Sequence, residues 1–202
     1  MRDLRSPLFH AGPLRAVELD AGDVPALQRF FEANPEYFFN VTGQAPAADE
    51  ALHELHDGPP ADVTLSRTWL LGFVDDDGAL VAMANVASDF MAEGVWLIGL
   101  FVVASSLHGT GTSEAIYRAL EAWVRGNGAH WIRLAVVVGN AKPERFWPKV
   151  GYTEVRRRTG VAMGQHVNTL RIMVKPLAGG EVSEYLALVA RDRPEVTRAA
   201  GG

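Results

Sequence analysis

A glycine-rich turn between an apolar run and a helical pattern constrains the fold more than any other feature of this chain. The apolar run covers residues 96–103, and helical spacing begins directly after the turn. A strand–turn–helix unit directs backbone N–H groups and the positive end of the helix dipole toward one point. Glycines let an anion approach the backbone because they carry no Cβ. The turn predicts an anion site, with an ordinary strand-to-helix connection as the alternative, and consists of His108, Gly109, Thr110, Gly111, Thr112 and Ser113.

A second motif follows another buried-strand pattern, at residues 131–138. It covers residues 140–152 and reads Asn-Ala-Lys-Pro-Glu-Arg-Phe-Trp-Pro-Lys-Val-Gly-Tyr. Two common phosphate-binding motifs do not fit the chain. The Gly-Lys-Ser/Thr string of a Walker loop is absent, and Glu114 stands where a dinucleotide fingerprint needs its third glycine. Neither nucleotide-binding fold is supported.

Together the two motifs resemble those of the GNAT superfamily of N-acetyltransferases. The turn is similar to the Arg/Gln-x-x-Gly-x-Gly/Ala pyrophosphate loop of that superfamily, with His108 at the Arg/Gln position, Gly111 at the first glycine and Ser113 at the small residue. The second motif is similar to the segment Asn-x-x-Ala-x-x-Phe-Tyr-x-x-x-Gly-Phe. Three of its positions match and two hold other aromatic residues; these are Asn140, Phe146 and Gly151, and Trp147 and Tyr152.

Periodicity and turn signals predict an α/β (α+β) fold, with a mixed, mostly antiparallel sheet flanked by about four helices. The resemblance implies the same element order and a sheet splayed between its fourth and fifth strands. We expect an N-terminal arm at residues 1–13, an acetyltransferase-like domain at 14–177 and a tail with a short helix at 178–202. The predicted strands cover residues 14–19, 67–74, 79–87, 94–103, 131–138, 152–158 and 167–175, and the predicted helices follow Asp23, Gly111 and Asn140 and cover residues 47–56 and 181–192.

Composition excludes several classes of function. The 202 residues contain no cysteine, which excludes a disulfide framework, a thiolate nucleophile and a cysteine-based zinc site. The net charge of −5 argues against nucleic acid as the main partner. Arg156-Arg157-Arg158 is the one local exception, and this run can also be a solvated strand end. The chain lacks a signal-peptide pattern and an apolar run of roughly 18 residues, so we expect a cytoplasmic protein without a membrane partner.

The resemblance implies acetyl-CoA as co-substrate and no metal. The pantetheine arm would bond to strand backbone at Phe101, Val102 and Val103. The pyrophosphate would meet main-chain N–H groups of residues 109–113, while Asn140 would contact the lower pantetheine arm and Phe146 would lie beside the cofactor. His108 can donate a hydrogen bond to phosphate, so acyl-CoA affinity is expected to weaken as pH rises through the imidazole pKa. The alternative for His108 is a solvent-facing loop residue.

The implied chemistry is direct attack of a neutral amine on the thioester, with an oxyanion donor from strand backbone near Phe101. Proton transfer has no obvious residues. The inner strand at residues 97–100 carries no ionisable side chain, and Glu93 at the strand entrance is the nearest candidate base, with a solvated turn residue as the alternative. Trp147 replaces the usual general-acid tyrosine and its indole is not a usable acid, whereas Tyr152 is expected in the core.

The resemblance implies that the acceptor is a primary amine of a small molecule or a protein. In the family two segments shape the acceptor site, and they correspond to residues 36–57 and 158–166 of this chain. The first segment is acidic, which indicates either a preference for a cationic amine or a solvated helix face. His53 and His56 lack an indicated third metal ligand. The alternative function is a catalytically weakened acyl-CoA-binding module with regulatory or partner-binding duties, its C-terminal helix serving as the contact. Acylation of RNA-borne amino acids is disfavoured by the charge, and a homodimer is compatible with the sequence.

Overall fold

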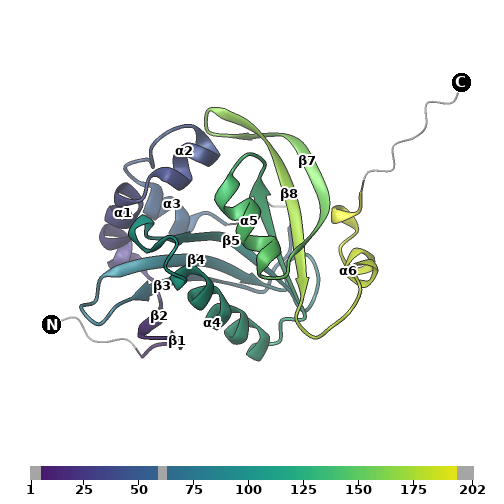
Figure 1. Cartoon of the computed structure of the whole chain (residues 1–202), viewed down its shortest axis with the longest axis horizontal. Coiled ribbons are helices and arrows are strands. Elements are labelled where there is room, and N and C mark those ends of the chain that lie inside the picture. Colours follow the sequence, from purple (N-terminus) through teal and green to yellow (C-terminus); the bar gives the residue numbers. More distant parts are fainter. Residues whose placement is uncertain (1–5, 59–62, 195–202) are drawn as a thin grey trace, which may run out of the picture.

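The computed structural model describes residues 6–58 and 63–194. Within this part of the chain one eight-stranded sheet has the order β1-β2-β3-β4-β5-β6-β8-β7 (Figure 1). Neighbouring strands are antiparallel except β5 and β6, which are parallel. The predicted mixed, mostly antiparallel sheet is therefore confirmed. The strands are β1 (Phe9–Ala11), β2 (Leu14–Glu18), β3 (Arg67–Val74), β4 (Leu80–Ser88), β5 (Val95–Val103), β6 (Trp131–Val137), β7 (Thr153–Met163) and β8 (His166–Pro176).

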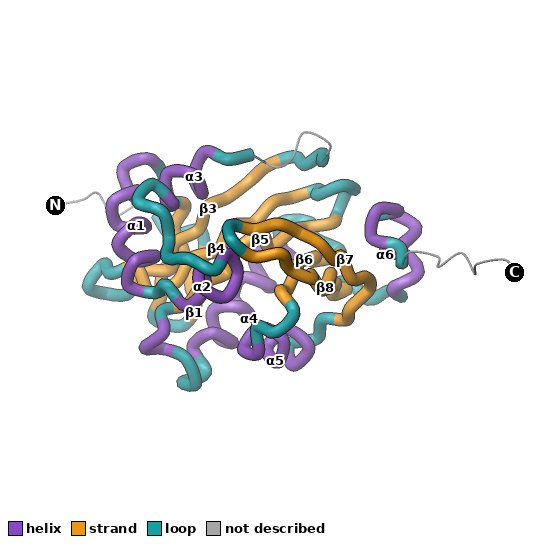
Figure 2. Tube along the Cα trace, turned by 90° about the horizontal axis from the view of Figure 1, so that it is seen from above, coloured by secondary structure: helices purple, strands orange, loops and turns teal. Residues whose placement is uncertain are grey.

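Helices cover both faces of this sheet (Figure 2). The apolar residues of α4 and Trp147 of α5 pack in one core cluster, whereas α1, α2 and α3 contribute to a second cluster on the opposite face. A third cluster joins α6 to β6, β7 and β8. The described helices are α1 (Val24–Ala33), α2 (Glu36–Thr42), α3 (Glu50–His56), α4 (Thr112–Gly126), α5 (Ala141–Lys149) and α6 (Val182–Leu188), with short 3-10 helices at Ala21–Asp23, Ser105–Leu107 and Ala190–Asp192.

The parallel strands β5 and β6 pair over only three positions. Val95, Trp96 and Leu97 lie opposite Trp131, Ile132 and Arg133, and no further partners follow although both strands continue. The strands therefore part toward their C-terminal ends, as the resemblance implies. A bulge accompanies this change, because Asn85 of β4 pairs with Leu100 while Val86 pairs with Ile98. Gly99 is the extra residue, and it is exposed although its neighbours on both sides are buried.

Several boundaries differ from the sequence predictions. Residues 9–11 of the expected N-terminal arm form β1, since Phe9 stacks on Trp123 with ring centroids 5.3 Å apart. The segment after Pro35 continues as α2, which the sequence did not predict, and the next helix begins at Glu50 rather than at residue 47. Strands β7 and β8 are longer than predicted because they form an extended hairpin. Residues 1–5 of the arm and 195–202 of the tail lie outside the described part.

The C-terminal segment is anchored at the closed end of β6. Its predicted helix is confirmed as α6 followed by a 3-10 turn, with Tyr185 and Val189, rather than Leu186, as its buried residues. Asp192 accepts hydrogen bonds from Nε of Arg133 at 2.6 Å and from the hydroxyl of Tyr185 at 2.6 Å. Asp192 and Arg133 are 0% and 5% exposed. The apolar side of this helix is thus packed against the sheet.

Candidate functional site

The parted ends of β5 and β6 border a cavity of about 760 Å³. Its floor consists of β5 from Ile98 to Val103 and β6 from Leu134 to Val137. The glycine turn and the start of α4 form one wall, α5 another and α2 a third. Most of the predicted cofactor residues are brought together here: Phe101, Val102, Val103, His108, Gly109, Gly111, Ser113, Asn140 and Phe146 line the cavity.

Beyond Leu97, the side of β5 that faces β6 has no strand partner, so its backbone polar groups face this cavity. The N–H of Ala104 donates to the carbonyl of Val81, which places the backbone of Ala104 on the β4 side. Backbone direction alternates along a strand, so the N–H and C=O groups of Phe101 and the carbonyl of Val103 point toward the gap. The His108 ring agrees with this, since its Nε2 lies 3.0 Å from the Val103 carbonyl oxygen. The gap therefore presents strand-like hydrogen-bonding groups to a ligand.

Both glycines of the turn adopt left-handed backbone conformations. Gly109 has φ +80° and Gly111 has φ +89°, and no heavy atom lies within 4 Å of the Cβ position at either residue. Gly111 is the N-cap of α4, so the first N–H groups of the helix point out of its N-terminal end. The hydroxyls of Thr110 and Thr112 lie 2.8 Å apart, and Thr110 also donates to the Leu107 carbonyl at 2.7 Å. These two threonines do not line the cavity and instead fix the shape of the turn.

The second motif supplies the opposite wall. Asn140 precedes α5 and its side chain makes no capping hydrogen bond, which leaves its amide available at the cavity. The ring of Phe146 stacks on Phe101 with centroids 6.3 Å apart. Trp147 is 6% exposed and packs edge-on against Phe101 and Tyr117. Tyr152 is buried beside Trp147, which confirms its predicted place in the core.

Cations gather at the rim of the cavity although the chain is acidic overall. Lys142 of α5 donates to Glu36 of α2 at 2.7 Å and to Nδ1 of His108 at 3.2 Å. The carbonyl of Val103 only accepts, so the hydrogen of the ring is on Nε2 and Nδ1 accepts from Lys142. Lys149 pairs with Glu114 at 2.8 Å, and Arg145 also lines the cavity. Exposed ion pairs contribute little to stability, so these lysines can exchange partners at low cost.

Glu93, the candidate base from the sequence, does not reach this cavity. It is exposed in the turn between β4 and β5 and is absent from the cavity lining. Gly99 lies six positions further along the chain, which is roughly 20 Å of extended chain. The turn lies at the paired end of β5, whereas the cavity lies at the parted end. Glu93 thus lies apart from the cavity, and a role for it as base or water-mediated relay stays a prediction.

A different carboxylate approaches the bulge from α3. Oε1 of Glu54 accepts a hydrogen bond from Nδ2 of Asn85 at 2.6 Å. The side chain of Asn85 in turn lies beside Gly99, with Cγ 3.9 Å from the position of a Cβ there. Burial raises the pKa of Glu54, the Asn85 hydrogen bond opposes this shift, and the charges of Glu50 and Asp57 add to it. Sequence reasoning named Glu54 only within an acidic segment.

Tyr37 is a phenol that sequence reasoning missed. It belongs to α2, and its ring lines the cavity. Burial raises the pKa of Tyr37 far above its usual value, and the carboxylates of Glu54 and Glu50 raise it further. Its hydroxyl therefore stays protonated and can donate. The only sequence signal was an aromatic residue after Asn34-Pro35, which does not distinguish a site residue from a core residue.

The two segments expected to shape an acceptor site meet above the cavity. The N–H of Gln165, in the β7–β8 turn, donates to the Thr42 carbonyl at 2.8 Å, and the Asn168 side chain donates to the Val41 carbonyl at 2.8 Å. Figure 1 shows the hairpin arching over to α2. Val41 and Met163 both line the cavity. The far end of the cavity is thus roofed by α2 and the hairpin.

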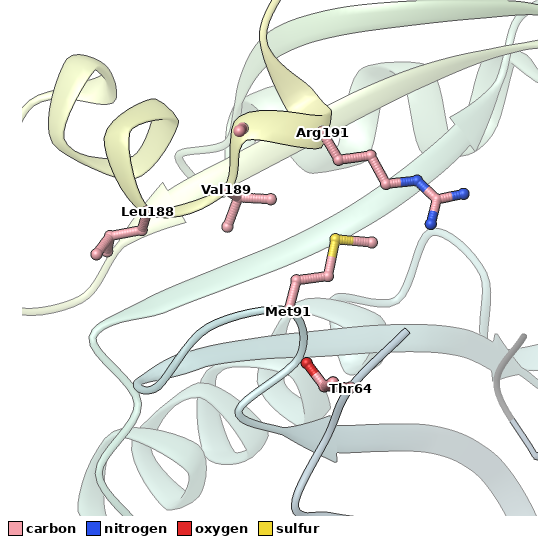
Figure 3. A pocket seen from close by; sticks show the side chains of 6 residues that line it. Thr64, Met91, Leu188, Val189 and Arg191 are labelled. Atoms are coloured by element: carbon pink, nitrogen blue, oxygen red, sulfur yellow. The ribbon is translucent and has the colours of Figure 1, made fainter. Parts of the chain in front are cut away.

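A smaller hollow of about 210 Å³ lies apart from this cavity, where the C-terminal segment passes the β4–β5 turn. Met91 points from the turn toward the segment that carries Val189 and Arg191 (Figure 3). The residues that line this hollow do not combine an acid, a base and a nucleophile. In residues 6–58 and 63–194 no group of three or more His, Asp or Glu side chains is suited to hold a metal ion. No helix in this part is long and apolar enough to cross a membrane.

Comparisons with known proteins identify the family and agree with the fold. The sequence pattern described as the acetyltransferase (GNAT) family matches residues 27–152. The spermidine N-acetyltransferase of Vibrio cholerae, solved with CoA and spermine, aligns with TM-score 0.64 and 14% identity over 83% of this chain and 97% of that one. The ribosomal-protein-S18-alanine N-acetyltransferase of Escherichia coli aligns with TM-score 0.61 and 14% identity over 83% and 96%. A GCN5-related N-acetyltransferase from Kribbella flavida aligns with TM-score 0.60 and 22% identity over 83% and 99%. The comparison with curated proteins gave no match.

Proposed function

This chain belongs to the acetyltransferase (GNAT) family, and from that premise we propose that it transfers an acetyl group from acetyl-CoA to a primary amine of a small molecule or a protein. The observation that carries the proposal is the cavity between the parted strands, where unpaired strand backbone and the N-terminus of α4 border the same space. Its volume of about 760 Å³ suits an extended ligand.

The residues of the cavity fit the chemistry of acetyl-CoA. A pantetheine arm carries amide groups, and the backbone N–H and C=O groups of Phe101 offer it the hydrogen bonds of an added strand. Gly109 and Gly111 leave room for a pyrophosphate at the first N–H groups of α4. The amide of Asn140 and the ring of Phe146 border the lower part of the arm.

The rim lysines provide charge for the phosphates. Lys142 is held by Glu36 and His108, and Lys149 by Glu114, in exposed ion pairs that an anionic ligand can replace. Lys142 and Lys149 lie at the two ends of α5, so the helix presents positive charge along the mouth of the cavity. In this arrangement His108 positions Lys142, in addition to any contact of its own with a phosphate.

In the proposed reaction the neutral amine attacks the carbonyl carbon of the thioester. A C–N bond forms, the C–S bond breaks, and the N–H proton passes to the departing thiolate. The backbone N–H of Phe101 donates to the developing oxyanion, since it points into the gap beside the bulge. Tyr37 supplies a protonated hydroxyl at the cavity, a property that the indole of Trp147 does not share.

The test is amine-dependent release of thiol from acetyl-CoA. A chain without cysteine adds no background in a thiol assay. A panel of small amines and N-terminal peptides is compared with acetyl-CoA alone, and we expect at least one amine to raise thiol release well above the rate with water. Binding of acetyl-CoA without acceleration by any amine would instead favour an acyl-CoA-binding regulatory module. Trp147 and the lack of an ionisable side chain in β5 are the features that speak for that second function.

A further inference from the structure

We propose that Glu54 is the general base of the reaction, taking a proton from an acceptor that arrives as an ammonium ion on the α3 side of the sheet. The inference rests on the proposed function, because it assigns a residue to the amine half of that reaction. It starts from the bulge in β5. Gly99 lines the cavity and is exposed, so the sheet is open at this point toward the face covered by α1, α2 and α3.

Asn85 and Glu54 are not part of the cavity lining but follow Gly99 on the α3 side of the sheet. The position of a Cβ on Gly99 is 3.9 Å from the Asn85 side chain, and Asn85 donates to Glu54 at 2.6 Å. Both side chains are half-buried and thus keep contact with solvent. Asn85 uses one amide hydrogen to fix one carboxylate oxygen, and in the described part of the chain no protein group donates a hydrogen bond to the second oxygen. In the proposed arrangement the amine binds beside Gly99 and Asn85 and passes its proton to that carboxylate directly or through one water.

The charges around Glu54 suit a base rather than an ion-pair partner. Glu50 and Asp57 flank it on α3, Tyr37 faces it from α2 and Asn85 from β4. These neighbours are anionic or neutral, so none neutralises the carboxylate. Burial and the two carboxylates raise the pKa of Glu54, which makes its ionised form a stronger proton acceptor. Tyr37 remains neutral over the pH range in which Glu54 ionises, because the pKa of Tyr37 is raised as well.

The proton inventory balances without another reactant. The carboxylate of Glu54 takes one proton from R–NH3⁺ and becomes neutral, and the resulting R–NH2 attacks the acetyl carbon. The second proton leaves the nitrogen as the amide forms and goes to the thiolate, which departs as CoA–SH. Glu54 then releases its proton to solvent. The products are the acetamide, CoA–SH and one proton.

The experiment compares the native chain with Glu54→Gln, which keeps an oxygen for the Asn85 hydrogen bond. Asp49→Asn is the matched control, because it removes an equal charge from an exposed position at the start of the same helix, and Asp49 is not among the groups that shift the pKa of Glu54. The most reactive of n-butylamine, 1,4-diaminobutane and alaninamide is used as acceptor between pH 5.5 and 9. Acetyl-CoA affinity by calorimetry and the melting temperature are measured for each protein.

We expect Glu54→Gln to lower kcat/KM at pH 7 by about 100-fold or more, the usual range for a general base, with unchanged acetyl-CoA affinity. Its remaining rate should rise about tenfold per pH unit, since only the free amine reacts below an alkylamine pKa near 10.4. The native rate should level off above the pKa of Glu54. Asp49→Asn should stay within about threefold of native.

Two results would overturn the assignment. If Glu54→Gln keeps kcat/KM within threefold of native and also keeps the native pH profile, Glu54 takes no proton in the reaction. Equal losses in Glu54→Gln and Asp49→Asn would point to general electrostatic attraction of the amine and overturn the role of Glu54 as base. A native chain that binds no acetyl-CoA or acetylates none of the amines would end the proposed function first, and the role of Glu54 with it.

Discussion

Strands β5 and β6 create two different environments along their length. At one end residues 95–97 pair with residues 131–133, and the ion pair between Arg133 and Asp192 is buried beneath the C-terminal segment. At the other end the same strands part around a cavity of about 760 Å³. The paired end holds its polar groups in internal hydrogen bonds, whereas the parted end leaves them for a ligand.

This difference teaches how a sheet can be opened without loss of its core. A parting of two strands leaves backbone groups without partners, and such groups are costly where water is excluded. The closed end stabilises the pairing of β5 and β6 next to the opening, and Gly99 adjusts the direction of β5 between the two ends. Stability and ligand binding should therefore respond to different substitutions along the same strands.

The largest effect is expected at the closed end. Asp192→Ala leaves Arg133 buried without its partner, and breaking a buried pair in this way costs about 3–5 kcal/mol. We expect denaturant unfolding to show a loss of that size, while the remaining folded protein binds acetyl-CoA with affinity within about threefold of native. Glu18→Ala, which breaks the exposed pair with Arg67, is the control and should change the free energy of unfolding little. A large loss of acetyl-CoA affinity in Asp192→Ala without a loss of stability would contradict the assignment of stability to the closed end and of binding to the open end.

The same ion pair makes the free energy of unfolding depend on pH in the acidic range. Burial alone would raise the pKa of Asp192, but the hydrogen bonds and charge of Arg133 outweigh it and lower the pKa. A lowered folded-state pKa means that this stability is fully present above the unfolded value, about 3.9, and is lost as pH falls below it. Unfolding at pH 7 and at steps below pH 4 should show a steeper loss for the native chain than for Asp192→Asn. Glu121 and Glu154, whose pKa values are also lowered, contribute equally to both proteins. Parallel curves would contradict a role of Asp192.

A smaller effect is expected at the open end from Asn140→Ala. Its side chain makes no capping hydrogen bond, so the melting temperature should stay within about 1 °C of native. Loss of one hydrogen bond to the pantetheine arm should weaken acetyl-CoA binding by roughly tenfold, corresponding to about 1.4 kcal/mol. Asn127→Ala, at the far end of α4, is the control and should bind normally. Native affinity in Asn140→Ala would remove this residue from the binding site.

The smallest effects are expected at the ion pair between Lys142 and Glu36, where removing either partner should change acetyl-CoA affinity in opposite directions. Lys142→Met should weaken acetyl-CoA binding by a few-fold and reduce its dependence on salt, because one cation near the phosphates is lost. Glu36→Gln should strengthen binding by a few-fold, since it frees Lys142 from its ion pair. Calorimetry at two salt concentrations measures both. Changes of the same sign would show that the contact holds α2 against α5 rather than competing with the ligand.

The two motifs that border the cavity could be found from the sequence because each of them is local. The turn at residues 108–113 and the motif at residues 140–152 are each continuous, and a glycine at positive φ is a requirement of one short segment. The order of strands and helices followed from periodicity for the same reason. The exception is α2, whose start directly after Pro35 looked like a helix end.

The acceptor half depends on contacts between distant segments. Glu54 meets Asn85 across 31 positions and Lys142 meets Glu36 across 106, and neither pair has a sequence signature. Burial selects Glu54 from five carboxylates in its segment, and only the packing of α3 on β4 decides which one. Gly99 was the one available signal, since a glycine inside an apolar strand pattern indicates a bulge.

The most direct measurement is calorimetric titration of acetyl-CoA into the native chain, Gly111→Glu and Gly128→Glu. Both substitutions place the same charged side chain at a positive φ in open space, +89° at the N-terminal end of α4 and +94° after its C-terminal end. Backbone strain is therefore matched, and only Gly111 lies at the cavity. We expect native and Gly128→Glu to bind alike and Gly111→Glu to bind at least 100-fold more weakly. Equal affinities in all three proteins, or no native binding at millimolar ligand, would contradict an acyl-CoA site between the parted strands.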